Sequence, residues 1–366
     1  MIGVIGLGQA GGNIANSFAE KGVLSAAINY SSKDLETCHH VPHKLKLHGS
    51  EGVGKQREEA IRLLHNNHES ALLFIKEHFS NLSIEAILIV FSTGGGSGSG
   101  IASLLTEILI NEMPNKTFIL CPILSSSNEC LTAHLNTMDT LSSISELDLC
   151  IVPVDNQNGI QKGKNYKVVN EQFVNQIISV VEYTERHSES GNFDSKDFLT
   201  LLSTPGFTSI GEIDLSKINT TGNHLTADST VEKVHESHVK SIYTNPSTEQ
   251  IVRAGFIYDG QDSLLNCLPS NVTDLYNNQP LDIFEGYYPG EGGKLITIFT
   301  GLKFNSERLK QIQEISEQRI EQFNSTHKST SISFKREAVV IPNTKSKTKQ
   351  SLSDILNKHK NNTISK

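Results

Sequence analysis

Glycines and hydroxyl side chains are concentrated in residues 91–100, which read FSTGGGSGSG. Glycine carries no side chain and permits positive φ, so successive backbone N–H groups in such a stretch can converge on an anion. Thr93, Ser97 and Ser99 add hydroxyl groups within the same stretch. These residue types at this spacing predict a phosphate cradle, and the alternative interpretation is a flexible Gly/Ser linker.

Apolar segments flank this stretch on both sides. Residues 86–90 (AILIV) precede it and residues 101–110 (IASLLTEILI) follow it. They predict a buried strand and a buried helix, and the start of that helix would add its dipole and unpaired N–H groups to the cradle. Because linkers seldom separate two such elements, the cradle is the favoured interpretation. No Gly-Lys-Ser/Thr ends the stretch, so it is not a P-loop.

A second glycine-rich turn follows the apolar residues 1–5. Gly6, Gly8 and Gly11 meet the G-x-G-x-x-G spacing, which alone would indicate an NAD or FAD site. A dinucleotide-binding protein would then need an acidic residue at the end of its second strand. That strand, residues 24–29, ends in Asn29. An NAD(P)-dependent oxidoreductase of the Rossmann type therefore stays open as the alternative from another class.

Residues 94–100 resemble the Gly-Gly-Gly-Thr/Ser-Gly-Ser/Thr-Gly phosphate loop of the tubulin/FtsZ superfamily, and Gln9 and Asn13 resemble the first loop of tubulins. The resemblance implies a GTPase that binds GTP or GDP with Mg²⁺ and polymerises head to tail. It assigns these residues to the nucleotide: Gly8, Gln9, Ala10, Asn13, Asn29, Lys33, Gly54, Lys55, Gly94, Gly95, Gly96, Ser97, Gly98, Ser99, Glu129, Asp155, Asn156, Asn170 and Phe173.

The family pattern also implies roles within this set. The polar loop 29–34 corresponds to one that reaches toward magnesium and the terminal phosphates. Gly54 and Lys55 belong to a loop expected at the γ-phosphate, with a plain strand–helix turn as the alternative. Glu129 fits a contact to the ribose. The arginine that division tubulins place beside it is absent from residues 125–142, and His134 is the candidate replacement.

The guanine base is expected near the end of the next strand and along a long helix. Asp155 and Asn156 follow residues 147–154, where the superfamily reads the guanine edge. Phe173 would stack on the base and Asn170 or Asn175 would bond to it. The alternative for Phe173 is a plain core position.

The catalytic group is expected on a loop that the superfamily inserts into the pocket of the next subunit, with the pattern Asn-x-Asp-x-x-Asp/Glu. We assign this loop to residues 203–217. Asp214 fits the central acid, Glu212 can supply a second carboxylate, and Lys217 stands where the last acid is expected, as in β-tubulin. Such carboxylates can hold and polarise an attacking water. The alternative is an ordinary turn with Asp214 as a helix N-cap.

The order of apolar segments predicts an α/β fold. Residues 1–165 would form a nucleotide-binding domain with a parallel sheet and helices on both faces, one of them spanning residues 56–79. A long central helix would occupy residues 166–186, and a second, smaller α/β domain residues 187–326. Residues 250–258 and 294–300 would be strands of a second sheet. A last strand (338–341) and a disordered basic tail would complete residues 327–366.

Charge is uneven along the 366 residues. The chain has a net charge of −8, whereas the nine basic and two acidic residues after Thr326 give that segment +7. A basic segment of this kind fits DNA or an acidic surface as partner, with a solubilising tail as the alternative. Plasmid-partition tubulins of the TubZ kind carry basic tails that contact a DNA-bound adaptor.

The remaining composition predicts a cytoplasmic protein that does not insert into membranes. The N-terminus enters a strand at once, which argues against a signal peptide, and no apolar run reaches ~20 residues. The five cysteines form no CxxC pair, and the His-rich residues 38–43 match no standard metal-ligand spacing. The favoured function is a filament-forming GTPase that segregates plasmid or phage DNA. An FtsZ-type division GTPase, a phage-spindle tubulin and a nucleotide-binding module without hydrolysis remain alternatives.

Overall fold

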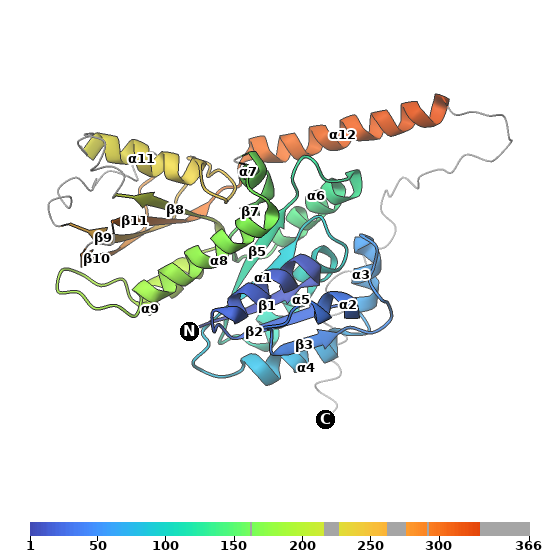
Figure 1. Ribbon diagram of the computed structural model, residues 1–366, viewed down its shortest axis with the longest axis horizontal. Helices are drawn as coiled ribbons and strands as arrows, with labels where there is room; N and C mark the ends of the chain where they lie inside the picture. Colours follow the sequence, from blue (N-terminus) through green and yellow to red (C-terminus); the bar gives the residue numbers. More distant parts are fainter. Residues whose placement is uncertain (162, 216–226, 262–275, 291–292, 330–366) are drawn as a thin grey trace.

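The computed structural model describes residues 1–161, 163–215, 227–261, 276–290 and 293–329, and Figure 1 shows their arrangement. Within these residues, 11 strands form one sheet in the order β10-β9-β11-β8-β6-β5-β4-β1-β2-β3, with β7 beside β5. The α/β class predicted from the sequence is confirmed.

Parallel strands build the first half of the sheet. The pairs β1–β2, β1–β4, β4–β5, β5–β6 and β2–β3 are all parallel. Val4 and Ile5, neighbours on β1, belong to two different core clusters, as expected when successive side chains point to opposite faces. Both faces are therefore covered, as predicted. The strands are β1 (Ile2–Leu7), β2 (Ser25–Asn29), β3 (His43–Lys46), β4 (Ala86–Ser92), β5 (Thr117–Leu124), β6 (Cys150–Ile151) and β7 (Val154–Asp155).

Two elements of this half differ from the prediction. The single helix expected over residues 56–79 is two helices, because the side chain of Asn67 donates to the carbonyls of Leu63 and His48 and ends the first of them. The strand expected over residues 147–154 is split into β6 and β7, with Pro153, which has no N–H to donate, between them. The helices are α1 (Gly8–Glu20), α2 (Ser32–Glu36), α3 (Arg57–Leu64), α4 (His68–Phe79), α5 (Ser97–Glu112), α6 (Leu131–Ser145) and α7 (Asn156–Gln161).

The central helix α8 (Tyr166–Tyr183) begins where the Asn165 side chain accepts a hydrogen bond from Val168 N. Its buried positions, including Val169, Ile177 and Val180, recur at helical spacing and face the core. In Figure 1 it runs between the two halves of the molecule, where the sequence predicted it.

The second half of the fold contains β8 (Gly206–Asp214), β9 (Arg253–Gly260), β10 (Asp282–Pro289) and β11 (Lys294–Leu302). We call this half the second domain and the half with β1–β7 the first domain. The prediction of a separate second sheet is wrong, because Gly206 and Phe207 of β8 pair in parallel with β6 and continue the ladder. The loop expected over residues 203–217 is largely the strand β8. The helices here are α9 (Ser195–Leu202), α11 (Ala227–Val239) and α12 (Ser306–Ser329).

The expected strand at 338–341 and nearly all of the basic tail lie outside the described residues, and so does Lys217. Among the helices that the structure describes, none combines the length and apolar character needed to cross a membrane.

Candidate functional site

A pocket of about 340 Å³ opens where β1 and β4 end. Eleven of the residues predicted to bind nucleotide line it: Gly8, Gln9, Ala10, Gly54, Lys55, Gly94, Gly95, Gly96, Ser97, Gly98 and Glu129. The nucleotide assignment did not name six others: Leu7, Ser31, Asp34, Gly52, Val53 and Ser92. Ser31 and Asp34 belong to the polar loop 29–34, which was expected near magnesium and the terminal phosphates. Pockets at the carboxyl ends of parallel strands are the usual ligand sites of α/β sheets.

Two glycine loops meet in the floor of this pocket. A Cβ on Gly8, whose φ is +71°, would lie 2.9 Å from Gly98 N, and a Cβ on Gly98 would lie 2.7 Å from Leu7 O. Only glycines allow this close approach. Helix α5 begins at Ser97 directly beside the loops, so its N-terminal N–H groups lie at the pocket. The chemistry of this cradle fits phosphate groups.

Asn136 of α6 holds two of the pocket loops together, and sequence reasoning missed it. Its side-chain NH₂ donates to Lys55 O and Gly95 O, each at 2.9 Å, and the residue is only 7% exposed. In a trans peptide the C=O and the following N–H point in opposite directions. Because Gly95 O points at Asn136, the N–H of Gly96 points away from Asn136.

Lys55 is, among the described residues, the one non-glycine with positive φ, at 64°. This conformation costs energy for a residue with a side chain, and such strain is found mainly at functional sites. The hydrogen bond from Asn136 to Lys55 O helps to hold it. Lys55 therefore brings the positive charge expected at the phosphates to the pocket wall.

Eight predicted residues lie outside the pocket wall, and four of them belong to the three loops nearest the phosphates. Asn13 and Lys33 are exposed, and Ser99 is buried behind the loop, where it donates to the carbonyls of Gly95 and Gly96. Asn29 is buried and donates to the Asp34 carboxylate at 2.9 Å. Asn29 therefore holds the one carboxylate that loop 29–34 brings to the pocket.

Glu129 stands at the rim, where its carboxylate accepts from Ser126 N at 3.1 Å. An arginine from α12 lies beside Glu129, since Arg319 donates to the carbonyls of Glu129 and Ser127. His134 does not replace it. Its ring is fully buried, neither nitrogen has a hydrogen-bond partner, and burial with the nearby Arg319 charge lowers its pKa.

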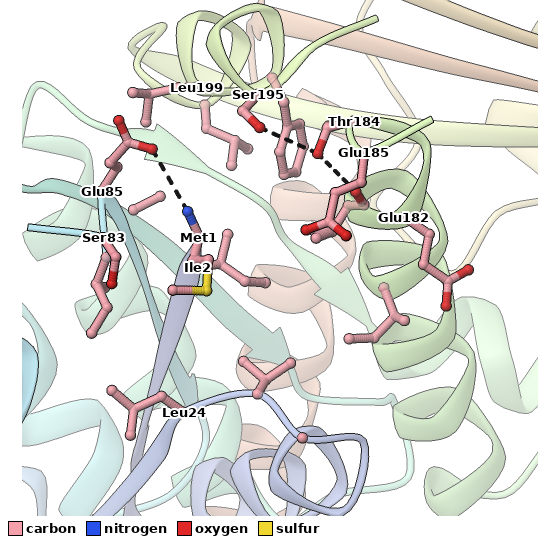
Figure 2. A pocket seen from close by; sticks show the side chains of 18 of the residues that line it. Met1, Ile2, Leu24, Ser83, Glu85, Glu182, Thr184, Glu185, Ser195 and Leu199 are labelled. Atoms are coloured by element: carbon pink, nitrogen blue, oxygen red, sulfur yellow. Dashed lines mark hydrogen bonds and ion pairs between the residues drawn. The ribbon is translucent and has the colours of Figure 1, made fainter. Parts of the chain in front are cut away.

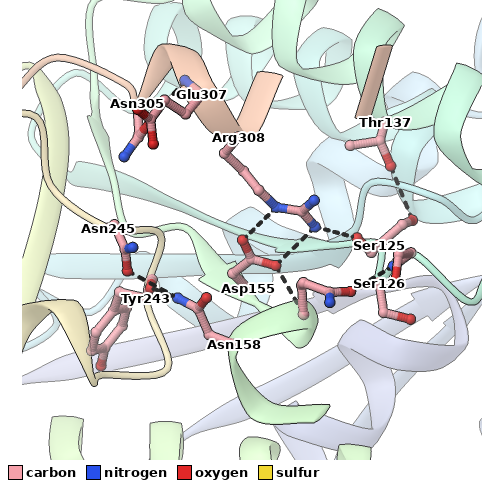
Figure 3. Close-up of polar contacts among 12 residues, drawn as sticks. Ser125, Ser126, Thr137, Asp155, Asn158, Tyr243, Asn245, Asn305, Glu307 and Arg308 are labelled. Atoms are coloured by element: carbon pink, nitrogen blue, oxygen red, sulfur yellow. Dashed lines mark hydrogen bonds and ion pairs between the residues drawn. The ribbon is translucent and has the colours of Figure 1, made fainter. Parts of the chain in front are cut away.

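Asp155 is not free to read a base. Figure 3 shows its carboxylate bound by Arg308 of α12, with distances of 2.7 and 3.1 Å, and Arg308 also donates to Ser125 O. Asp155 is 1% exposed, and its carboxylate is occupied by this ion pair and by a hydrogen bond from Gln157 N at 2.9 Å. Asn156, at the start of α7, has a buried side-chain oxygen without a hydrogen-bond partner.

Phe173 lies in the core, where it makes edge contacts with Phe18 and Tyr243 and is 0% exposed. Its ring has no face available for a base, so the core alternative is correct. The exposed aromatic residue of α8 at this end is Tyr166, which is 43% exposed and hydrogen-bonded to Ser126. Asn170 lies one turn later on the same helix face.

Glu212 and Asp214 lie at the end of β8, in a groove that β8 forms with α8 and α11. Glu212 pairs with Lys294 at 3.3 Å. Because β8 is parallel to β6, β5 and β4, its carboxyl end points toward the same edge of the sheet as the pocket. In a head-to-tail filament, a group that completes a neighbour's pocket has to lie at the opposite edge. Their catalytic role stays a prediction that this geometry disfavours.

A better match to Asn-x-Asp-x-x-Asp directly follows the central helix. It is Asn192-Phe193-Asp194-Ser195-Lys196-Asp197, which sequence reasoning did not assign to the site although it fits the pattern without a substitution. We call residues 184–197 the acidic loop. Figure 2 shows Thr184 and Ser195 across a cavity from Met1, Ile2 and Glu85. These last residues lie at the amino ends of β1 and β4, at the edge opposite the pocket.

Local hydrogen bonds shape the end of the acidic loop. Asp194 is exposed and accepts from Lys196 N and Asp197 N, while Asp197 accepts from Asp194 N, a capping box that starts α9. Burial raises the pKa of Asp197, while the hydrogen bond from Asp194 N lowers it and the Asp194 charge raises it. A carboxylate with a raised pKa is a stronger base.

Comparison with known proteins finds a family match for the first domain. Residues 1–162 match the Tubulin/FtsZ family, GTPase domain. Tubulin-like protein TubZ of Clostridium botulinum C phage is 28% identical over 217 residues, 57% of this chain and 58% of that protein. Tubulin-like protein CetZ of Thermococcus kodakarensis is 22% identical over 330 residues, 84% of each chain.

The fold agrees with a solved filament structure. A GTPγS-form protofilament of Bacillus thuringiensis serovar israelensis TubZ has a TM-score of 0.76 at 17% identity, covering 90% of this chain and 94% of that chain. At this identity the similarity shows the fold. No group of three or more His, Cys, Asp or Glu side chains suited to a metal ion occurs among the described residues.

Proposed function

Because residues 1–162 of this chain are a GTPase domain of the tubulin/FtsZ family, we propose that it binds GTP with Mg²⁺, polymerises head to tail and hydrolyses GTP between subunits. The observation that carries the proposal is the position of two sites on one sheet. The glycine-lined pocket lies at the carboxyl ends of the strands, and the acidic loop lies at their amino ends.

Nucleotide binding follows from the pocket's chemistry. The backbone N–H groups of residues 94–98 and the Lys55 charge suit the phosphates, and the Asp34 carboxylate, an oxygen ligand, suits Mg²⁺. Mg²⁺ would neutralise phosphate charge there. Tyr166 and Asn170 are the residues we assign to the guanine base, in place of Phe173 and Asp155. The family match to a GTPase domain favours GTP over the dinucleotide alternative.

Catalysis is divided between two chains in this proposal. Asp194 and Asp197 of one subunit would hold and deprotonate the attacking water at the pocket of the next subunit, because carboxylates act as general bases. Each chain carries both halves of the site, yet at opposite edges of its sheet. Hydrolysis must then appear only when subunits associate. Related proteins that form protofilaments support this arrangement.

The segregation of plasmid or phage DNA in the cytoplasm is the cellular role we favour. It rests on the net charge of +7 after Thr326, which suits a DNA-bound adaptor, and on the similarity to a TubZ protein of a phage. Similarity to CetZ extends over more of the chain and keeps a role other than DNA segregation open. Loss of adaptor–DNA binding on removal of residues 343–366 would favour DNA segregation over the other role.

Asp194→Asn and Asp197→Asn test the shared site. Asparagine is as good an N-cap as aspartate, so Asp194→Asn removes the charge and keeps the cap. We expect both variants to bind GTP and to co-assemble, with turnover per assembled subunit reduced by about 10²–10⁴-fold. Asp214→Asn serves as the matched control and should retain turnover. Normal turnover in both loop variants, or activity linear in protein concentration down to nanomolar, would rule out the shared site.

A further inference from the structure

Tyr183, the last residue of α8, and Arg186 of the acidic loop bind one carboxylate of the second domain. The Tyr183 hydroxyl donates to Asp259 Oδ2 at 2.7 Å, and Arg186 donates to the same oxygen at 2.8 Å. The Arg186 guanidinium also lies over the Tyr183 ring, 4.2 Å from its centre. Burial raises the pKa of Tyr183, so its hydroxyl stays protonated and donates. Asp259 lies on β9 and is nearly buried.

The last part of the same loop is attached to β10, the neighbouring strand. The Tyr288 hydroxyl accepts from Phe193 N at 3.0 Å and donates to Tyr183 O at 3.1 Å. Tyr287 N donates to Gly191 O at 3.0 Å. Phe193 is fully buried, so Tyr288 is the partner of an N–H that water does not reach. Both ends of the loop are thus bound to two adjacent strands.

Toward the first domain the loop has different surroundings. There, Thr184, Glu185 and Ser195 border a cavity of about 590 Å³ whose far wall includes Met1, Ile2 and Glu85 (Figure 2). Hydrogen bonds therefore attach the loop to the second domain, and empty volume separates it from part of the first. A displacement of β9 and β10 relative to the first domain would carry the loop with it.

We propose that Asp259 and Tyr288 are positioning residues that set the acidic loop for hydrolysis in the neighbouring subunit's pocket. Strands β9 and β10 then determine the catalytic geometry of a site to which they contribute no reacting group. This inference rests on the proposed function, because it assumes that Asp194 and Asp197 act on the neighbour's nucleotide. A misplacement of about 1 Å at such a site costs up to ~10²-fold in rate.

Asp259→Asn and Tyr288→Phe test the proposal in the full-length chain. The first keeps the side-chain shape and removes the charge that holds Arg186, and the second removes the acceptor of Phe193 N–H. Asp282→Asn is the matched control, since it breaks the Arg253–Asp282 ion pair, 2.7 Å long, between the same two strands without touching the loop. Hydrogen exchange of residues 184–193 is measured beside GTP affinity, KM and kcat of assembled protein.

We expect faster exchange of the loop amides in both variants, kcat reduced about 10- to 100-fold, and unchanged GTP affinity and KM. The control should match wild type in all four measurements. Unchanged loop exchange would overturn the attachment, and faster exchange with wild-type kcat would overturn the positioning role. If Asp194→Asn abolishes turnover while Asp259→Asn and Tyr288→Phe do not, only this inference fails. If Asp194→Asn and Asp197→Asn both turn over normally, the proposed function itself fails.

Discussion

Replacing Asn136 tests whether the two pocket loops must be held together for phosphate binding. Asn136→Ala removes two partly buried hydrogen bonds, to Lys55 O and Gly95 O, both 2.9 Å long. Each is worth about 0.5–1.5 kcal/mol, so roughly 1–3 kcal/mol is lost. If the loss falls on the bound state, nucleotide affinity drops about 5- to 150-fold. Asn136→Asp should cost more, because a carboxylate would then face these carbonyl oxygens.

Affinities for GTP, GDP and guanosine, measured by fluorescence titration and competition, separate this role from general destabilisation. If the loop presents its N–H groups to phosphates, Asn136→Ala should bind GTP and GDP more weakly than wild type and should bind guanosine with unchanged affinity. Asn111→Ala is the control, since it removes a similar bond, Asn111 to Glu107 O at 2.8 Å, from an exposed position of α5. Equal losses for guanosine and GTP, or none at all, would refute the reasoning.

Three further substitutions probe two glycines of the pocket loop and a buried histidine of the second domain. Gly95→Ala should weaken GTP binding and leave the thermal unfolding of the apo protein unchanged, because no atom lies closer than 3.9 Å to the added Cβ. Gly96→Ala should lower stability by about 1–3 kcal/mol, since its Cβ would lie 2.6 Å from Val53. Equal melting temperatures for the two variants would contradict this difference. Burial lowers the pKa of His238 to about 3. Between pH 6.5 and 3 the His238 imidazole is therefore protonated only in the unfolded chain, so acidification in that window should lower the free energy of unfolding by about 1.4 kcal/mol per pH unit. Urea unfolding of wild type and His238→Gln at pH 7 and 5 should give a shallower pH dependence for the variant, and parallel pH dependences would count against it.

Sequence alone predicted the parts of the site that depend on local backbone. Two loops that meet at the start of a helix require glycines or small residues at the contact. Residues 94–98 and Gly8 meet this requirement, so their pattern in the sequence indicated the pocket. The parallel sheet and the central helix followed from apolar periodicity in the same way. These features are encoded within about 20 residues of where they act.

Contacts between distant segments could not be found in this way. Asp155 has the right type for guanine recognition, but Arg308, 153 positions later, occupies it. The arginine beside Glu129 comes from Arg319, 190 positions later. Whether Phe173 or Tyr166 faces solvent depends on which side of α8 packs against Phe18 and Tyr243, and a helical pattern with apolar residues on several sides leaves that choice open.

The acidic loop is a different case, because its signal was present in the sequence. Asn192, Asp194 and Asp197 fit the expected pattern. Sequence reasoning did not ask at which edge of the sheet each candidate loop would lie. Helix α8 has 18 residues and is therefore about 27 Å long at 1.5 Å per residue. It starts at Tyr166, bonded to Ser126 near the pocket rim, and ends at Tyr183, bonded to Asp259 beside the acidic loop.

A rigid helix of that length keeps the two halves of the proposed catalytic site apart within one chain. No side chain can reach across about 27 Å, so Asp194 and Asp197 cannot serve the pocket of their own subunit. Stacking subunits along the direction of α8 removes the separation, because the loop edge of one sheet then meets the pocket edge of the next. Hydrolysis by this chain should therefore depend on its assembly, and the length of the central helix is the physical reason.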